Sequence, residues 1–484
     1  MTASSTQAPE ATTASGLKGS LGPISIVFMV VAAAAPLTVV GGGTPVGIML
    51  GNGAGFPLNY VVTGVILLLF SVGMSAMSRH IAKPGAFFTY IGSALSRPLG
   101  VGSAFVALAT YTLVQVGVYG FLGDQLRIVT TALGLPSLPW WAFALVMVAV
   151  TGFLGYRHIE LSSKVLGVLL LGEIGIVAAL CIAIFLKGGA EGISLAPFSL
   201  TEALKGSPGV GLTFAVAGFV GFEATAIFRD EAKDPARTIP RATYIAIISI
   251  GVFYAIASWA LVLAWGPSNI VAAATADPAG MIVTTASKYL GGPAAVIIQT
   301  LFLTSLFACV LAFHNVLARY LHAMAGSSVM PKSLHTVHDT FGSPHAASLV
   351  QTASAAVLIA ACALLGMDPV LQVFSWGSGI AVLGVLVLMA LTCLAVLVFF
   401  QRNPGLDHRI WHTKIAPGLG LIGLVGLTVI VALNFPTLIG GDAALAIALG
   451  AIIVVALAVG IGVAFTLKRR SPHLYETVID AIAG

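Results

Sequence analysis

Long apolar segments recur along nearly the whole chain of 484 residues, and short polar connections separate them. Each approaches or exceeds the roughly 20 residues that an α-helix needs to cross the hydrocarbon core of a bilayer. The pattern predicts twelve membrane-spanning helices, at about 23–50, 57–78, 101–126, 139–156, 161–186, 209–229, 243–265, 291–321, 347–366, 370–400, 415–437 and 443–467. The expected fold class is therefore an all-α integral membrane protein, since the connections leave no room for a sizeable soluble domain.

Composition supports the same class. The chain is 58% hydrophobic and 8% charged, whereas soluble proteins carry about 25% charged residues. The four cysteines lie in apolar segments, and their spacing predicts neither a disulfide framework nor a metal site. We expect no cofactor. Residues 1–18 are predicted to form a disordered tail, 19–470 the membrane domain, and 471–484 a C-terminal tail.

The basic residues predict the orientation of the chain. With a cytoplasmic N-terminus and twelve spans, 18 of the 22 Lys and Arg residues fall on the cytoplasmic side. This asymmetry follows the positive-inside rule and predicts a multi-pass protein of the cell membrane with both termini in the cytoplasm. The net charge of +5 is thereby explained by topology, so no nucleic-acid partner is expected.

Two of the predicted spans carry helix-weakening residues near their middle. The first contains Pro36 and, beyond it, the consecutive glycines Gly41, Gly42 and Gly43, with Pro45 where a second half-helix could begin. The sixth contains Gly218 and Gly221. Interruptions at matching positions of two halves, here five helices apart, indicate the binding site of a secondary transporter. The alternative is that the glycines permit close helix packing and that Pro36 only kinks its helix.

Broken helices offer backbone groups to a charged ligand. The free amides at the start of a half-helix suit a carboxylate, and freed carbonyls at the end of another suit an ammonium group. Phe219 and Phe222 could cover the substrate side chain, or they could pack in the core or against lipid. The candidates in the first span are Pro36, Leu37, Thr38, Val39, Val40 and Gly41, with the amides from Thr38 onward as donors. The candidates in the sixth are Ala217, Gly218, Phe219, Gly221 and Phe222, with the first three supplying the carbonyls.

The third span presents polar tips on one face. Tyr111, Gln115 and Tyr119 recur every four residues and therefore share one side of the helix. They could line a substrate cavity or hydrogen-bond neighbouring helices, and the sequence does not choose between these two roles. Phe374, Ser375 and Trp376 in the tenth span are weaker candidates.

Glu173 and Glu223 are the two acids that fall well inside a predicted span. Ionisable residues in the membrane are expensive and mark functional sites by default. Removal from water disfavours the charged form of a carboxylate, so either acid could take up and release a proton during a transport cycle. The alternative for Glu223 is a hydrogen-bonded acid that fixes the helix interruption.

The stretch "GFEATAIFRDEAKDPARTIPRA", residues 221–242, resembles the sixth helix and following loop of the amino acid–polyamine–organocation (APC) transporter superfamily. The shared pattern is Gly-Phe-Glu, an acid at Glu231, Lys-x-Pro, and a second Pro. Residues 312–338 are similar to the eighth helix of that superfamily, and 79–100 to its loop around Pro84 and Gly85. The resemblance covers about residues 20–470.

The resemblance implies a LeuT-like fold, with inverted repeats of five helices at about 23–187 and 209–400 and peripheral helices at about 415–467. It implies a secondary active transporter that imports an amino acid by alternating access, with no enzymatic activity. In some proton-coupled relatives a lysine stands at the position that corresponds to Glu173. A carboxylate there could carry a proton or coordinate sodium, so a proton is the favoured coupling ion and sodium stays open. The alternatives are a transporter of polyamines or other organic amines, and an amino acid exchanger without ion coupling.

Overall fold

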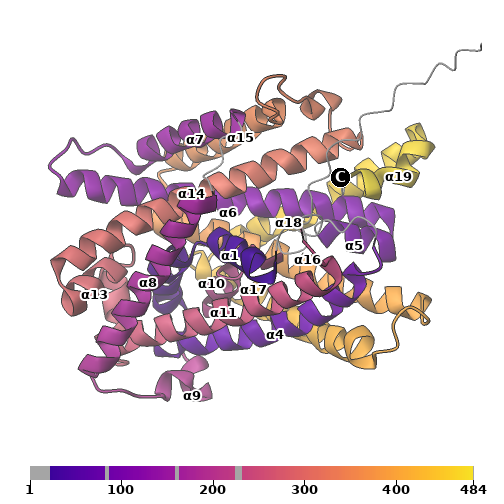
Figure 1. The fold of residues 1–484 in the computed structure, drawn as a ribbon. Helices are drawn as coiled ribbons and strands as arrows, with labels where there is room; N and C mark the ends of the chain where they lie inside the picture. The colour runs from indigo at the N-terminus through magenta and orange to yellow at the C-terminus, as the bar shows by residue number, and fades with distance from the viewer. Residues whose placement is uncertain (1–21, 82–86, 158–162, 224–231, 483–484) are drawn as a thin grey trace, which may run out of the picture.

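The computed structural model describes residues 22–81, 87–157, 163–223 and 232–482. The predicted N-terminal tail lies outside these ranges. Three residues of the family resemblance, Pro84, Gly85 and Glu231, also lie outside them. Within them the regular elements are helices. Most long helices run alongside one another, with α13 and α9 at one end of the molecule and α5 and α19 at the other (Figure 1).

The long helices follow the predicted spans closely. Nine helical segments of the described residues are long and apolar enough to cross a membrane, or ten when one bent pair counts as a span. Every predicted range overlaps a helix, although the total of twelve spans stays a prediction. The first predicted span is divided between α1 (Pro23–Ala33) and the segment from Pro36 to Asn52. The helices that the other predicted ranges overlap are α4 (Phe56–Ser78), α6 (Arg97–Ala132), α7 (Trp140–Tyr156), α8 (Ser163–Lys187), α10 (Pro208–Ala217), α11 (Pro235–Trp265), α14 (Gly292–Gly326), α15 (His345–Leu364), α16 (Ser375–Arg402), α17 (Ala416–Leu438) and α18 (Ala443–Arg470).

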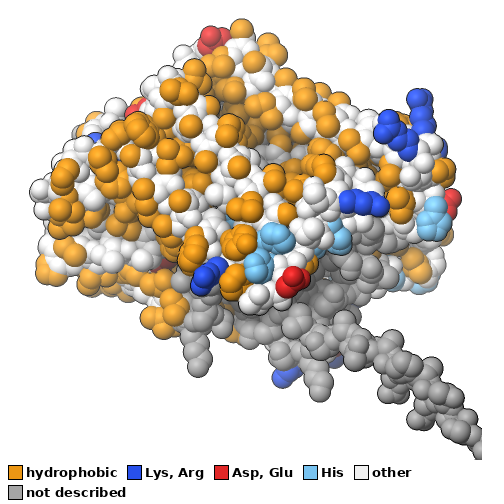
Figure 2. Space-filling view, turned by 90° about the horizontal axis from the view of Figure 1, so that it is seen from above, with side chains coloured by type: hydrophobic (Ala, Val, Ile, Leu, Met, Phe, Trp, Pro, Cys, Tyr) orange, Lys and Arg blue, Asp and Glu red, His pale blue; other side chains and the backbone are white. Residues whose placement is uncertain are grey.

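Helix α6 lies at the centre of the packing, in contact with α5, α7, α14, α16 and α18. It packs closely on α18, where a Cβ placed on Gly460 would lie 2.6 Å from the Cα of Gly102. Small residues allow the two backbones to pack this closely. Such van der Waals packing drives helix association in lipid, where no hydrophobic driving force acts between helices. The outer surface is apolar, as lipid contact requires: α8 exposes Val168, Leu171 and Ile182. Hydrophobic side chains cover most of the face in Figure 2, and His, Lys and Arg gather toward one side of it.

Two helical elements occupy regions that the sequence reading treated as connections or tail. A pair of short helices, α12 (Ile270–Ala276) and α13 (Met281–Leu290), is bent by 116° between α11 and α14. Helix α13 buries Met281 and Ile282 against α8 and the first broken helix. Polar residues interrupt the hydrophobic run there, which is why a search for long apolar segments missed it.

Residues of the predicted C-terminal tail form α19 (Pro472–Ile482), which packs on α5 (Phe87–Ala94), α6 and α14. Val478 and Ile479 are buried in this contact. Ile479 lies over Gly92 and Gly100, where a Cβ on either glycine would come within 2.6 Å of its side chain. The absence of side chains at the two glycines thus allows α19 to pack closely on α5 and α6.

Candidate functional site

The first predicted span is interrupted at Ala35. Helix α1 ends before it, and Ala35 adopts the left-handed conformation with φ 47° and ψ 70°. The chain then continues as α2 (Pro36–Thr38), the π-helical turn η1 (Val39–Gly43), α3 (Thr44–Gly47) and η2 (Ile48–Asn52). The prediction that a second half-helix begins at Pro45 is wrong, because it begins at Pro36, where a proline loses no hydrogen bond.

The glycines beyond this break serve close packing. A Cβ on Gly41 would lie 3.1 Å from the Phe302 ring, and one on Gly42 would lie 2.7 Å from the Phe121 ring. The packing alternative therefore describes these glycines, whereas the interruption comes from Ala35 and Pro36. Left-handed geometry at a non-glycine residue costs about 1–2 kcal/mol and often marks a functional site.

The interruption predicted in the sixth span is confirmed. Helix α10 ends at Ala217, Gly218 caps it, and the chain turns through Gly221, which has φ 109°. The continuation of this span at 224–231 lies outside the described residues. The carboxyl end of α10 is thereby left inside the helical bundle.

A small cavity of about 60 Å³ separates the two interruptions. The broken helices supply part of its wall through Ala34, Thr38, Val39, Gly43, Ala217 and Gly218. Side chains of α6, α14 and α16 complete it, among them Val114, Val118, Phe313 and Val382. The amino end of the segment that starts at Pro36 and the carboxyl end of α10 thus meet at one cavity.

The structure brings together only some of the predicted site residues at this cavity. Thr38, Val39, Ala217 and Gly218 line it, together with the weaker candidate Phe374. Sequence reasoning missed Val114 and Val118 because apolar residues in a membrane helix carry no distinguishing pattern. The candidates that are not among the lining residues are Pro36, Leu37, Val40, Gly41, Tyr111, Gln115, Tyr119, Phe219, Gly221 and Phe222.

Glu173 of α8 reaches the first interruption. Its Oε2 accepts a hydrogen bond from the backbone amide of Leu37 at 3.1 Å and another from the Ser305 hydroxyl at 2.9 Å. Thr38 donates its own hydroxyl to Ser305 at 3.1 Å. The carboxylate therefore occupies the amino end of the second half-helix, where backbone amides and the helix dipole favour a negative charge.

Glu223 is held at the second interruption. Its Oε1 accepts a hydrogen bond from the Tyr111 hydroxyl at 2.7 Å, and its Oε2 accepts one from the Gly221 amide at 2.9 Å. Tyr111 lies on α6, so the acid ties the turn after α10 to the central helix. The ring of Tyr111 also packs edge-on against Tyr320.

The other two polar tips of the third span join neighbouring helices. Gln115 donates to the Val310 carbonyl at 3.1 Å and accepts from the Gln351 side chain at 2.6 Å. The hydroxyl of Tyr119 is hydrogen-bonded to that of Thr151. Of the two roles left open by the sequence, these contacts match the second, in which the polar face links helices.

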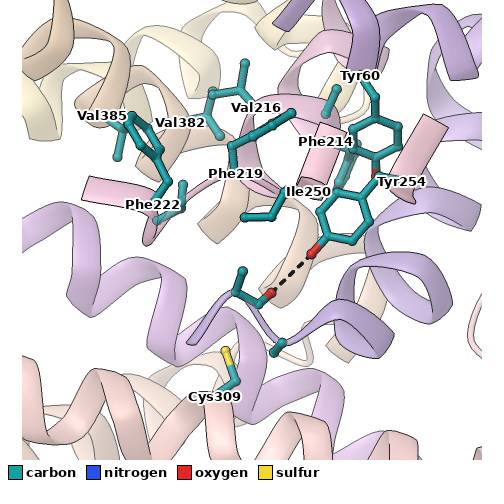
Figure 3. Close-up of a cluster of buried hydrophobic side chains, with 14 of the residues drawn as sticks. Tyr60, Phe214, Val216, Phe219, Phe222, Ile250, Tyr254, Cys309, Val382 and Val385 are labelled. Atoms are coloured by element: carbon teal, nitrogen blue, oxygen red, sulfur yellow. Dashed lines mark hydrogen bonds between the residues drawn. The ribbon is translucent and has the colours of Figure 1, made fainter. Parts of the chain in front are cut away.

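Aromatic side chains pack beside both interruptions. Phe219 contacts the rings of Tyr60 and Tyr254, and Phe222 contacts the ring of Phe70 edge-on. Tyr254 points its hydroxyl at the carbonyl of Ala34, at 3.5 Å, from the side opposite Cys309 (Figure 3). Phe219 and Phe222 are fully buried, and in this conformation they are part of the core.

The chain has many apolar spans, and two of them are interrupted around a shared cavity. These features define a multi-pass helical membrane protein with an internal site. The chain belongs to the amino acid permease family, whose model matches residues 25–476. The resemblance to the APC superfamily is thereby confirmed, and with it the class of transport protein.

Individual relatives are more distant. The low-affinity putrescine importer PlaP of Escherichia coli (strain K12) is 23% identical over 361 residues, which cover 73% of this chain and 75% of the relative. The uncharacterized transporter Rv1999c of Mycobacterium tuberculosis is 29% identical over 233 residues, or 48% of each chain. The uncharacterized transporter Mb2001c of Mycobacterium bovis is 25% identical over 304 residues, with 57% of this chain and 61% of the relative covered.

Proposed function

We propose that the chain is a secondary active transporter that imports an amino acid across the cytoplasmic membrane by alternating access, driven by protons. In this proposal both termini are cytoplasmic, and the helices form LeuT-like inverted repeats at about 23–187 and 209–400. Membership of the amino acid permease family supports transport of a small molecule. The observation that carries the rest is the cavity between two helix ends of opposite polarity.

The polarity of the two ends matches the charges of an α-amino acid. The segment that starts at Pro36 directs its amino end, and thus partial positive charge, toward the cavity wall at Thr38. Helix α10 directs its carboxyl end, and thus partial negative charge, toward the wall at Gly218. We place the substrate carboxylate at the first end, with Glu173 protonated so that no like charge opposes it, and the substrate ammonium group at the second.

We assign coupling to Glu173. As a carboxylate it accepts hydrogen bonds from both Leu37 and Ser305, which ties α8 and α14 to the second half of the first broken helix. Such donors stabilise the charged form, and protonation removes the charge that faces the helix end. Binding and release of one proton would therefore change how tightly this half-helix is held, which is what coupling requires.

We assign gating to Glu223. Its bonds to Tyr111 and Gly221 hold the turn after α10 in one arrangement relative to α6. Alternating access moves one group of helices against another around a fixed site, so a contact of this kind must be kept in one state and released in another. The acid thereby links the break in the sixth span to the central helix.

Three alternatives are separable from this function by experiment. The relative PlaP is named a putrescine importer, which favours transport of an organic amine. Glu173, Ser305 and Thr38 also present oxygens within one hydrogen-bonded chain, a ligand type that suits sodium as well as a proton. An exchanger would need neither ion.

The test is uptake by purified protein in liposomes, screened over the twenty amino acids and common amines. Each substrate is measured with an inward proton gradient, with an inward sodium gradient and with neither. The proposal predicts saturable uptake of at least one amino acid that only the proton gradient drives. Uptake that ignores both gradients but depends on amino acid inside the liposomes would replace it by exchange.

A further inference from the structure

The cavity wall is apolar. Val114 and Val118 of α6, Phe214 of α10 and Val382 of α16 form much of it. Its polar side chains are Thr38, Ser378 and the thiol of Cys309. Among the described residues, none of the lining side chains belongs to Asp, Glu, Lys or Arg, so the backbone ends of two helices are its strongest electrostatic features.

The two buried acids lie beside this space and are held by other partners. Glu173 is occupied by the Leu37 amide and Ser305, and Glu223 by Tyr111 and the Gly221 amide. Neither lines the cavity. A cationic group placed against the valines would be buried without a partner, which is strongly unfavourable.

The apolar wall and the two helix ends favour a zwitterion with an apolar side chain over a diamine or a charged amino acid. The two charges of a zwitterion each meet a helix end of the opposite sign, and an apolar side chain meets the valines. A diamine would match one ammonium group to the end of α10 and leave the second against the amino end of the other half-helix, which repels it when Glu173 is protonated. A charged amino acid side chain would lack a partner in the same way.

Size narrows the class further. A cavity of about 60 Å³ is small beside the roughly 300–1,000 Å³ of sites that enclose drug-sized ligands. Val118 and Val382 are buried and reach the cavity from different helices. Together they restrict the space left for a substrate side chain.

We infer that the site selects α-amino acids with a small, uncharged side chain, that Val118 and Val382 set the upper limit on its size, and that diamines are rejected. This inference rests on the proposed function and adds the substrate class to it.

The experiment measures inhibition of labelled alanine uptake by unlabelled competitors in proteoliposomes, with direct binding to the purified protein as a second readout. Alanine, serine and valine are expected to compete at least tenfold better than lysine, glutamate or putrescine. In Val118→Ala the preference should shift toward leucine over alanine by about tenfold, as the loss of side-chain bulk predicts.

Val116→Ala is the matched control, because Val116 is a buried valine on the same helix that does not line the cavity. Its competition profile should equal that of the unaltered protein. Putrescine or lysine competing as well as alanine would overturn the substrate class and leave amino acid transport standing. Binding and uptake of no amino acid at all would overturn the proposed function itself.

Discussion

The carboxylate of Glu173 accepts a hydrogen bond from the backbone amide of Leu37 at 3.1 Å. The contact joins α8 to the first free amide after the left-handed residue Ala35, because Pro36 has no amide hydrogen to give. A buried acid thereby caps the half-helix that also lines the cavity through Thr38 and Val39. Any change in the charge of Glu173 acts directly on one wall of the proposed substrate site.

Glu173→Gln should uncouple transport from protons. The glutamine oxygen can still accept from Leu37 and Ser305, so substrate binding should persist within about threefold, but the side chain can no longer exchange a proton. We expect exchange of labelled for unlabelled substrate to continue while accumulation driven by a proton gradient is lost. Proteoliposome uptake and exchange measure the two separately.

Glu476→Gln, the same chemical change at an exposed position of α19, serves as its control and should leave both activities intact. Concentrative, proton-driven uptake by Glu173→Gln would remove the coupling role from this residue.

Tyr111→Phe should slow transport, because it removes the hydrogen bond that holds Glu223. The substitution leaves the Oε1 atom of a buried acid without its donor, a loss worth about 1–3 kcal/mol. We expect a lower rate of uptake, an altered pH profile and reduced thermal stability in detergent.

Tyr119→Phe is the comparison, since Thr151 keeps its bonds to the Met147 and Val148 carbonyls when the hydroxyl is removed. It should leave the pH profile unchanged. The gating role fails if the two substitutions alter the pH profile equally.

Ala35→Gly and Ala35→Val should differ in their effects on stability and uptake. Glycine adopts the left-handed conformation without steric cost, whereas a β-branched side chain at φ 47° is strongly strained. We expect the valine variant to lose stability and uptake and the glycine variant to retain both. Thermal unfolding in detergent and initial uptake rates provide the comparison, and equal stability of the two variants would contradict the local geometry.

Ile479→Asp should release α19 from the bundle. Its side chain is buried over Gly92 and Gly100, and burial of an unpaired carboxylate there would cost several kcal/mol. Leu474→Asp changes an exposed residue of the same helix and should have little effect. Limited proteolysis should cut the C-terminal segment faster in the first variant alone, and similar rates in both would mean that α19 is not held by Ile479.

The sequence predicts the spans well because their signal is long and local. A run of apolar residues must form its backbone hydrogen bonds internally in lipid, so helices form wherever the run is long enough. The bent pair α12 and α13 was missed for the same reason, since its helices are short and carry polar residues. Its place against α8 depends on packing that no local pattern encodes.

The sequence reading placed the start of the second half-helix of the first span at Pro45, whereas the structure places it at Pro36. Three consecutive glycines suggested a weak helix, but packing against Phe121 and Phe302 holds them in a π-helical turn. The useful signal was Pro36, because the residue before a proline avoids the right-handed helical region. Applied to Ala35, this rule gives the break where the structure has it. The partners of Glu173 and Glu223 were beyond such rules, because Ser305 and Tyr111 come from distant parts of the chain.

The most direct test of the central claim is accumulation of labelled alanine in proteoliposomes of the unaltered protein under an inward proton gradient. The account predicts saturable uptake above the external concentration, collapse of that uptake when the gradient is dissipated, and no effect of a sodium gradient. Saturable, concentrative uptake of putrescine with no alanine uptake under the same gradient would contradict it.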